Sequence, residues 1–173
     1  MNVVAWLARR RVALGLLTAV AAAILARPTW TSWGAGLAIA LAGELIRVWA
    51  AGHLEKRKEV TRSGPYRWTR HPLYAGSCVI ATGVVVAALH PIVAVLAIVY
   101  LGSTITAAIT TEEAFLRKAF GDTYDRYARS RVGSPEAARR FSLARAVGNR
   151  EYRAVVGVLA GFAFLALKIV LSL

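Results

Sequence analysis

The amino-acid sequence predicts an all-α integral membrane protein with about five transmembrane helices and a cytoplasmic helical segment beside them. Hydrophobic residues make up 57% of the 173 positions. The mean hydropathy is +0.52, which is too apolar for an ordinary soluble domain of this size. Apolar runs close to the ~20 residues that cross a bilayer recur along the chain. The whole chain, residues 1–173, is therefore expected to form a single membrane domain.

The first apolar run, residues 12–26, follows a basic stretch that contains Arg9, Arg10 and Arg11. A secretory signal begins in the same way, but residues 27–30 (Arg-Pro-Thr-Trp) do not form a small-residue cleavage site. We therefore expect a retained transmembrane helix. Because the run is short, the helix should extend toward the N-terminus while the arginine side chains reach back to the membrane surface.

Four more spans are expected, at residues 33–51, 72–89, 92–109 and 154–173. Pro72 suits the first turn of a helix, where a missing N–H costs no intrahelical hydrogen bond. Only the turn at residues 89–91 joins the third span to the fourth. These two helices should therefore form an antiparallel hairpin.

The distribution of lysine and arginine orients the predicted helices. Residues 1–11 contain three of them, residues 52–71 six and residues 110–153 ten, whereas residues 27–32 contain one and residues 89–91 none. Cytoplasmic connections of membrane proteins carry the excess of basic residues. The N-terminus and both long segments, 52–71 and 110–153, are therefore expected on the cytoplasmic side, with the C-terminus on the opposite side.

Apolar residues recur at helical spacing between Glu113 and Gly121, beyond the fourth predicted span. This spacing predicts that the helix continues and stops at the glycine. We expect the continuation to lie along the membrane surface. Tyr124 and Tyr127, three residues apart, should share one face of the turn that follows.

The open end of the predicted hairpin gathers polar side chains that are far apart in the sequence. The third span begins beside His71 and Tyr74, and the fourth ends beside Glu112 and Glu113. A helix N-terminus adds free N–H donors and a partial positive charge. Together these groups suit a zwitterionic, nucleotide-like cofactor with a positive centre. The alternative is that the aromatic and basic residues here only sit at the level of the lipid headgroups.

Glu44 and Arg47 lie three residues apart within the otherwise apolar second span, so they share a helix face. Charged residues inside a span commonly face a partner or a cavity. The two side chains either pair with each other or contact a ligand at headgroup depth. His53, just past this span, has either a structural role at the interface or a role in catalysis. No metal site is expected, because the three histidines and the single cysteine lack ligand spacing.

The net charge of +13 does not indicate a nucleic-acid-binding protein, because the basic residues flank apolar runs and form no separate basic domain. A lipid bilayer with anionic headgroups is the expected partner. The sequence contains no P-loop, dinucleotide-binding glycine fingerprint or nucleophile elbow. It also lacks the strand–helix alternation of a soluble methyltransferase or dehydrogenase.

Four stretches between Glu44 and Arg131 together resemble the isoprenylcysteine carboxyl methyltransferase and phospholipid methyltransferase superfamily. They are Arg47-Val48-Trp49-Ala50-Ala51-Gly52-His53, Gly64-Pro65-Tyr66 with Arg70-His71-Pro72-Leu73-Tyr74-Ala75-Gly76, Glu112-Glu113-Ala114-Phe115-Leu116 and Phe120-Gly121-Asp122-Thr123-Tyr124-Asp125-Arg126-Tyr127. Members of this superfamily are integral-membrane enzymes that use S-adenosylmethionine. The resemblance implies that this cofactor is bound by Arg70, His71, Leu73, Tyr74, Gly76, Glu112 and Glu113.

The reaction that the resemblance implies is methyl transfer to a membrane-embedded lipophilic acceptor. The acceptor could be an isoprenylcysteine-like carboxylate, a phospholipid amine or another amphiphile. The expected catalytic residues are Glu113, Arg47 and His53. Glu113, Glu112 or His53 would take a proton from an amine acceptor, and Arg47 would hold an anionic group. Such an active site would face the cytoplasm.

Two features depart from the pattern of the superfamily. In the superfamily a Val-Pro pair and a proline-rich end usually follow the position of Tyr127, and this sequence has neither. Members that methylate prenylcysteine carry an arginine where this sequence has Ala108 and Ile109. These departures leave the acceptor open. The membrane fold also resembles that of sterol reductases that use NADPH, and fold does not determine the reaction. An NADPH-dependent reductase of a membrane sterol or enone, and a non-enzymatic lipid-binding protein, are therefore the alternative functions.

Overall fold

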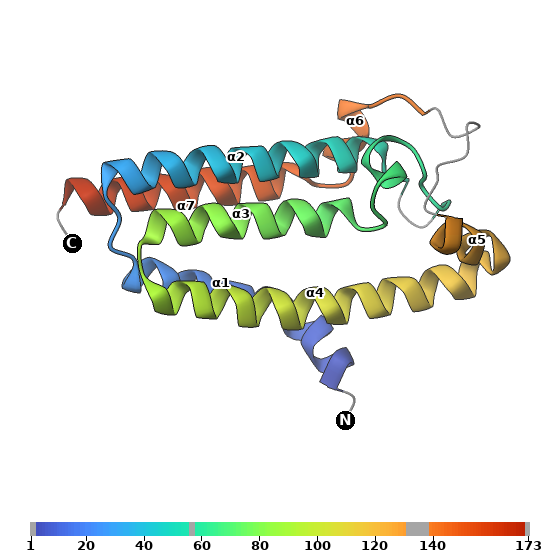
Figure 1. Cartoon of the computed structure of the whole chain (residues 1–173), viewed down its shortest axis with the longest axis horizontal. Helices are drawn as coiled ribbons and strands as arrows, with labels where there is room; N and C mark the ends of the chain where they lie inside the picture. The colour runs from blue at the N-terminus through green and yellow to red at the C-terminus, as the bar shows by residue number, and fades with distance from the viewer. Residues whose placement is uncertain (1–2, 56–57, 131–138, 172–173) are drawn as a thin grey trace.

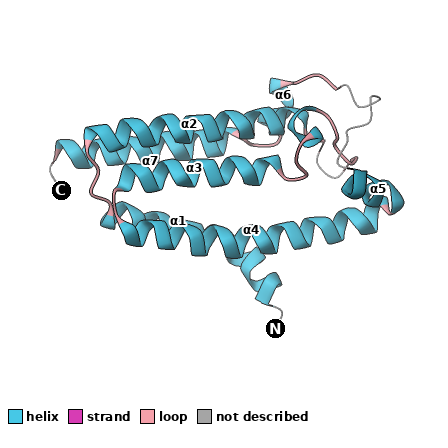
Figure 2. Ribbon diagram, viewed as in Figure 1, coloured by secondary structure: helices cyan, strands magenta, loops and turns pink. Residues whose placement is uncertain are grey.

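The computed structural model describes residues 3–55, 58–130 and 139–171. All regular secondary structure within these residues is helical (Figure 2), which confirms the all-α prediction. The elements, labelled in Figure 1, are α1 (Val3–Leu25), α2 (Trp30–His53), η1 (Gly64–Arg67), α3 (Pro72–Ala88), α4 (Pro91–Phe120), α5 (Asp122–Ser130), α6 (Leu143–Gly148) and α7 (Tyr152–Val170).

The long helices form two layers (Figure 1). One layer contains α2, α3 and α7, and the other contains α1 and α4. Although α3 and α4 are neighbours in the sequence, α3 packs mainly on α2 and α4 packs mainly on α1. The predicted hairpin therefore bridges the two layers. Both cavities described below have walls from more than one of these helices.

Glycines allow α2 and α3 to pack with their backbones almost in contact. A Cβ atom on Gly43 would lie 2.7 Å from the Ile80 backbone nitrogen, and one on Gly83 would lie 2.6 Å from the Ala40 backbone nitrogen. Both distances are far below an ordinary van der Waals contact. Small residues of this kind let helices associate in lipid, where the hydrophobic effect does not drive association. A larger side chain at either glycine would push the two helices apart.

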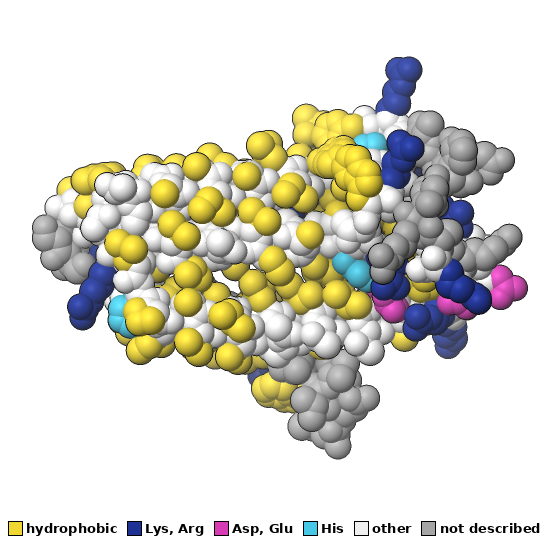
Figure 3. Space-filling model, viewed as in Figure 1, with side chains coloured by type: hydrophobic (Ala, Val, Ile, Leu, Met, Phe, Trp, Pro, Cys, Tyr) yellow, Lys and Arg dark blue, Asp and Glu magenta, His cyan; other side chains and the backbone are white. Residues whose placement is uncertain are grey.

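Three helices of the described chain, α2, α4 and α7, are long and apolar enough to cross a membrane. Two shorter apolar helices are Val12–Leu25 and α3. In the view of Figure 3, hydrophobic side chains cover the length of the molecule, and charged side chains gather mainly at the end where α5 lies. These features support an integral membrane protein, and the count of five spans stays a prediction.

The helix boundaries differ from the predicted spans mainly at α1, which begins at Val3, as the expected extension toward the N-terminus allows, and at α2 and α4. α2 begins at Trp30 because Thr29 and Ser32 form a capping box, in which each side chain accepts a hydrogen bond from the other residue's backbone N–H, at 3.2 and 3.0 Å. α4 ends before Gly121, as predicted, and this glycine has a φ of +46°, a backbone region that glycine adopts at little cost. Residues 113–120 continue α4 as one uninterrupted helix, as predicted, and their position along the membrane surface stays a prediction.

We predict that α6 lies on the cytoplasmic side and that the start of α2 lies on the opposite side, because only this topology places the basic segments together. In a Cys78→Ser background, a cysteine replacing the exposed Val147 should react with a membrane-impermeant maleimide only from the cytoplasmic face. A cysteine replacing the exposed Thr31 should react only from the other face. Labelling of the Val147→Cys variant from outside intact cells would contradict the topology.

Candidate functional site

A cavity of about 370 Å³ lies where α3 begins. Its walls come from the connection after α2, η1, the first turn of α3, the middle of α4 and both tyrosines of α5. We refer to it as the polar pocket, because charged and hydroxyl side chains line it. They include Glu55, Arg70, His71, Tyr74, Glu112 and Tyr124. The sequence analysis predicted four of these six.

Glu113 organises one wall of the polar pocket. Its Oε1 atom lies 3.0 Å from Arg70 Nη1 and 3.2 Å from His71 Nε2, and its Oε2 atom lies 3.4 Å from Arg117 Nη2. Only 16% of the Glu113 side chain is exposed, and it does not itself line the cavity. Arg70 and His71 do line the cavity, and Glu113 fixes both of them from the side that faces away from it.

Tyr74 and Glu112 complete the pairing across the two helices that was expected from the sequence. The Tyr74 hydroxyl donates a hydrogen bond to Glu112 Oε2 at 3.0 Å. The rings of His71 and Tyr74 lie 5.7 Å apart. The start of α3 and the last third of α4 are thus joined by two adjacent contacts, one through Glu113 and one through Glu112.

The tyrosines of α5 close another side of the pocket. Tyr127 is buried and donates a hydrogen bond to the Tyr66 carbonyl oxygen at 2.7 Å. Burial raises the pKa of Tyr127 to about 12, so its hydroxyl keeps its proton at neutral pH. Tyr124 is 1% exposed, and burial raises its pKa as well. Its hydroxyl lies beside Arg70 and makes no well-formed hydrogen bond to a described residue.

Arg47 lies on the other side of the first turn of α3. Its Nε atom is 2.6 Å from Glu151 Oε1 and 3.9 Å from Glu44 Oε2. Its Nη1 atom donates to the Leu73 carbonyl oxygen at 3.3 Å and to the Ser77 hydroxyl. The ion pair between Arg47 and Glu44 that the sequence suggested is therefore weaker than the one between Arg47 and Glu151. Glu151, at the start of α7, was missed because helical spacing relates only residues of one helix.

His53 has a packing environment typical of a structural residue. It is buried, and its Nδ1 atom lies 3.0 Å from the Ser63 hydroxyl oxygen. Its ring lies 6.3 Å from the Phe141 ring and 6.4 Å from the Trp49 ring. His53 does not line the polar pocket. Its arrangement corresponds to the structural alternative raised from the sequence.

Leu73 and Gly76 were both expected to contact a cofactor, and they face different surroundings. Leu73 lines the polar pocket. Gly76 is buried against α2, where an added Cβ atom would lie 2.6 Å from Arg47 Cγ and 2.8 Å from the Gly43 carbonyl oxygen. Its missing side chain is therefore required for helix packing, and Gly76 does not line the pocket.

Residues in and near α6 make hydrogen bonds to the end of α2 and ion pairs with the acidic residues on one wall of the pocket. Arg145 Nε donates to Glu55 Oε1 at 2.9 Å, which lowers the pKa of Glu55. Arg139 Nη1 lies 2.8 Å from Glu59 Oε1. Asn149 Nδ2 donates to the carbonyl oxygens of Ala51 and Leu54, both at 2.9 Å. Sequence reasoning did not find these contacts, because the connections that carry them have no periodic pattern.

Comparison with known proteins identifies relatives for the part of the chain that contains the pocket. A family model described as phospholipid methyltransferase matches residues 16–123. Two probable protein-S-isoprenylcysteine O-methyltransferases, from Oryza sativa subsp. indica and Oryza sativa subsp. japonica, are each 34% identical over 105 residues. Each alignment covers 54% of this chain and 55% of the relative, so the chain spans about half the length of these relatives. No solved structure matches the chain.

Proposed function

From the premise that the chain belongs to the phospholipid methyltransferase family, we propose that it transfers a methyl group from S-adenosylmethionine to a lipophilic acceptor in the membrane. One observation carries this proposal most directly: Arg70, His71, Tyr74 and Glu112, on the wall of the polar pocket, all lie within the residues that the family model matches, and of the other lining residues only Tyr124 and Tyr127 lie beyond it. Under the predicted topology, the pocket opens toward the cytoplasm.

The residues of the pocket fit S-adenosylmethionine in size and in charge. A cavity of about 370 Å³ falls within the range of roughly 300–1,000 Å³ typical of small-molecule sites. The cofactor has a carboxylate, an ammonium, a sulfonium and ribose hydroxyls. Arg70 would hold the carboxylate, and Glu112 would hold the ammonium. The buried Tyr124 hydroxyl lies beside Arg70 and Glu113 without a well-formed hydrogen bond to either, so it would be able to contact a polar group of the cofactor.

When bound, S-adenosylmethionine supplies an electrophilic methyl group attached to a positively charged sulfur. The protein then has to align the acceptor with this group and keep water away. Glu113 contributes by fixing Arg70 and His71. A carboxylate acceptor needs no base, whereas an amine acceptor has to lose a proton. Of the two adjacent carboxylates, only Glu112 lines the pocket, while Glu113 contacts three cationic or imidazole groups.

The comparisons favour methyl transfer over the two alternatives raised from the sequence. Both the family description and the names of the two relatives refer to methyltransferases. The names of the relatives specify an isoprenylcysteine, and that of the family a phospholipid. An amphiphile with a lipid chain is common to both, and we propose an acceptor of this kind.

We predict that the detergent-purified protein binds S-adenosylmethionine and does not bind NADPH. The reason is that the pocket presents carboxylates to a cationic ligand, whereas the phosphates of NADPH would be repelled by them. Isothermal titration calorimetry with each ligand measures the two affinities. Transfer of a labelled methyl group into the lipid fraction of nanodiscs tests the reaction itself. Tight binding of NADPH, with no binding of S-adenosylmethionine, would overturn the proposal in favour of the reductase.

A further inference from the structure

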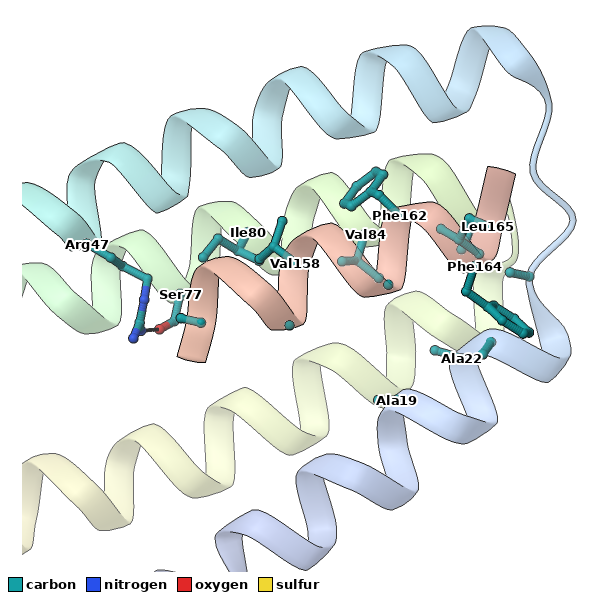
Figure 4. Close-up of a pocket in the computed structure, with 16 residues that line it drawn as sticks. Ala19, Ala22, Arg47, Ser77, Ile80, Val84, Val158, Phe162, Phe164 and Leu165 are labelled. Carbon is teal, nitrogen blue, oxygen red and sulfur yellow. Dashed lines mark hydrogen bonds between the residues drawn. The ribbon is translucent and has the colours of Figure 1, made fainter. Parts of the chain in front are cut away.

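A second cavity of about 490 Å³ lies among α1, α3 and α7 (Figure 4). Nearly all of its lining is apolar, with small residues from α1 and larger ones from α3 and α7. Its only charged lining residue within the described chain is Arg47, and the hydroxyl of Ser77 lies next to it. Figure 4 shows these two residues at one end and Phe164 and Leu165 toward the other. The cavity therefore has one polar end and a long apolar body.

One face of α3 connects this apolar cavity to the polar pocket. Ser77, Ile80, Val84 and Ala88 line the apolar cavity at successive spacings of three or four residues, which places them on one side of the helix. Leu73, four residues before Ser77, is on the same side and lines the polar pocket. Lining residues of the two cavities thus follow each other along α3, four residues or about 6 Å apart.

The polar end of the apolar cavity is built from three helices. Arg47 comes from α2, Ser77 from α3 and Glu151 from the start of α7, and Arg47 contacts both of the others. Arg47 also donates to the Leu73 carbonyl oxygen, at the boundary with the polar pocket. Because Glu151 already balances the charge of Arg47, the arginine holds this junction together and does not demand an anionic ligand there.

The wall that α7 contributes has gaps where a chain-shaped molecule fits. Gly157 and Gly161 both line the cavity, and an added Cβ atom on either would meet no other atom within 4 Å. They are separated by one turn, about 6 Å along the axis. α7 lies outside residues 16–123. This wall is therefore an addition of this chain to the segment that the family model covers.

We propose that the apolar cavity holds the hydrocarbon chain of the methyl acceptor, with the reactive head group at Arg47 and Ser77 beside the polar pocket. This inference rests on the proposed function. The order of polarity along the cavity matches an amphiphile with a single chain: a polar head at the junction and an apolar tail toward Phe164 and Leu165. The length of the cavity then limits the length of the chain that the protein accepts.

Filling the cavity from α7 tests the proposal. Gly157→Leu and Gly161→Leu each add a side chain at a lining position with open space. Gly102→Leu is the matched control, because Gly102 also has open space around it and lines neither cavity. Two probe series of increasing chain length, S-alkylcysteines and single-chain phosphoethanolamines, are assayed for methylation in nanodiscs. Their binding to the protein without a methyl donor is measured separately by native mass spectrometry.

In both cavity variants, affinity and turnover for long-chain probes should fall by about tenfold or more. Effects of this size are typical when hydrophobic space in a pocket is lost. The longest chain that Gly157→Leu still accepts should be shorter than the longest chain that Gly161→Leu accepts, because position 157 is nearer to the polar end. The control should match the wild type. If chain-length profiles are the same in all four proteins, the proposal is overturned.

The two readouts separate this proposal from the proposed function. If the wild-type protein methylates neither probe series and binds no S-adenosylmethionine, the proposed function fails. Loss of long-chain binding in the two cavity variants would still support the cavity as a chain-binding site. If methylation occurs and the cavity variants bind and methylate long chains as well as the control does, the proposed function stands and the cavity proposal is overturned.

Discussion

Replacing Glu113 by alanine is expected to weaken binding of S-adenosylmethionine by roughly tenfold to a hundredfold. Glu113 lies 3.0 Å from Arg70 and 3.2 Å from His71, and it orients both toward the pocket. Losing a hydrogen bond to a charged group costs about 1.5–3 kcal/mol, which corresponds to this loss of affinity. Because Glu113 lies near the end of α4, we expect the variant to remain folded. Isothermal titration calorimetry measures the effect directly.

Asp125→Ala is the matched control for the Glu113 variant. Asp125 Oδ1 lies 3.4 Å from Arg117 Nε, so this change also removes a carboxylate from the surroundings of Arg117. The Asp125 pair is exposed, and exposed pairs contribute little. His71→Ala should resemble Glu113→Ala, and the double variant should be no worse than the more severe single variant, because the two residues share one contact. Unchanged affinity in Glu113→Ala would remove this residue from the site.

Replacing Glu151 by alanine is expected to have the largest effect on stability, roughly 3–5 kcal/mol. The change leaves Arg47 without its nearest carboxylate, 2.6 Å away, in a position where only 20% of the arginine side chain is exposed. Glu44, 3.9 Å away, would then be the nearest carboxylate, and a largely buried charge that loses its close partner costs far more than the pair contributes. The midpoint of thermal unfolding in detergent should fall clearly below that of the wild type.

In a Glu44→Gln background, which leaves no carboxylate behind when the arginine is removed, the double variant Arg47→Met with Glu151→Leu should recover most of the lost stability, because replacing a buried ion pair by apolar residues of similar size is often neutral. It also provides the control for the position itself. If Glu151→Ala unfolds at the same temperature as the wild type, the contact with Arg47 contributes no net stability. If the double variant is as unstable as Glu151→Ala, the loss comes from packing at position 151 and not from the unpaired charge.

The features that could be predicted from the sequence are those that neighbouring residues determine. Pro72 and the short turn at residues 89–91 define the two helices of the hairpin. Counting back from that turn places His71 near Glu113, and the two side chains are indeed 3.2 Å apart. The all-helical fold followed from composition and from the length of the apolar runs.

The features that could not be predicted depend on which helix packs against which. Arg47 and Glu151 are 104 positions apart, and no periodicity in either helix indicates that α7 lies beside α2. For the same reason the sequence did not reveal that Gly76 faces α2. The acids Glu55 and Glu59 gave no signal either, because their arginine partners lie in an irregular segment.

The hydrogen bonds around the end of α2 also have a consequence for the order in which the protein is made. Arg145 donates to the Gly52 carbonyl oxygen across 93 positions of the chain, and the Ser142 backbone N–H donates to the same oxygen at 3.1 Å. At a synthesis rate of about 5–20 residues per second, these donors leave the ribosome roughly 5–20 seconds after their acceptor. A chain that ended before residue 142 would contain every residue that the family model matches, but it would lack both donors to the Gly52 carbonyl oxygen at the end of α2.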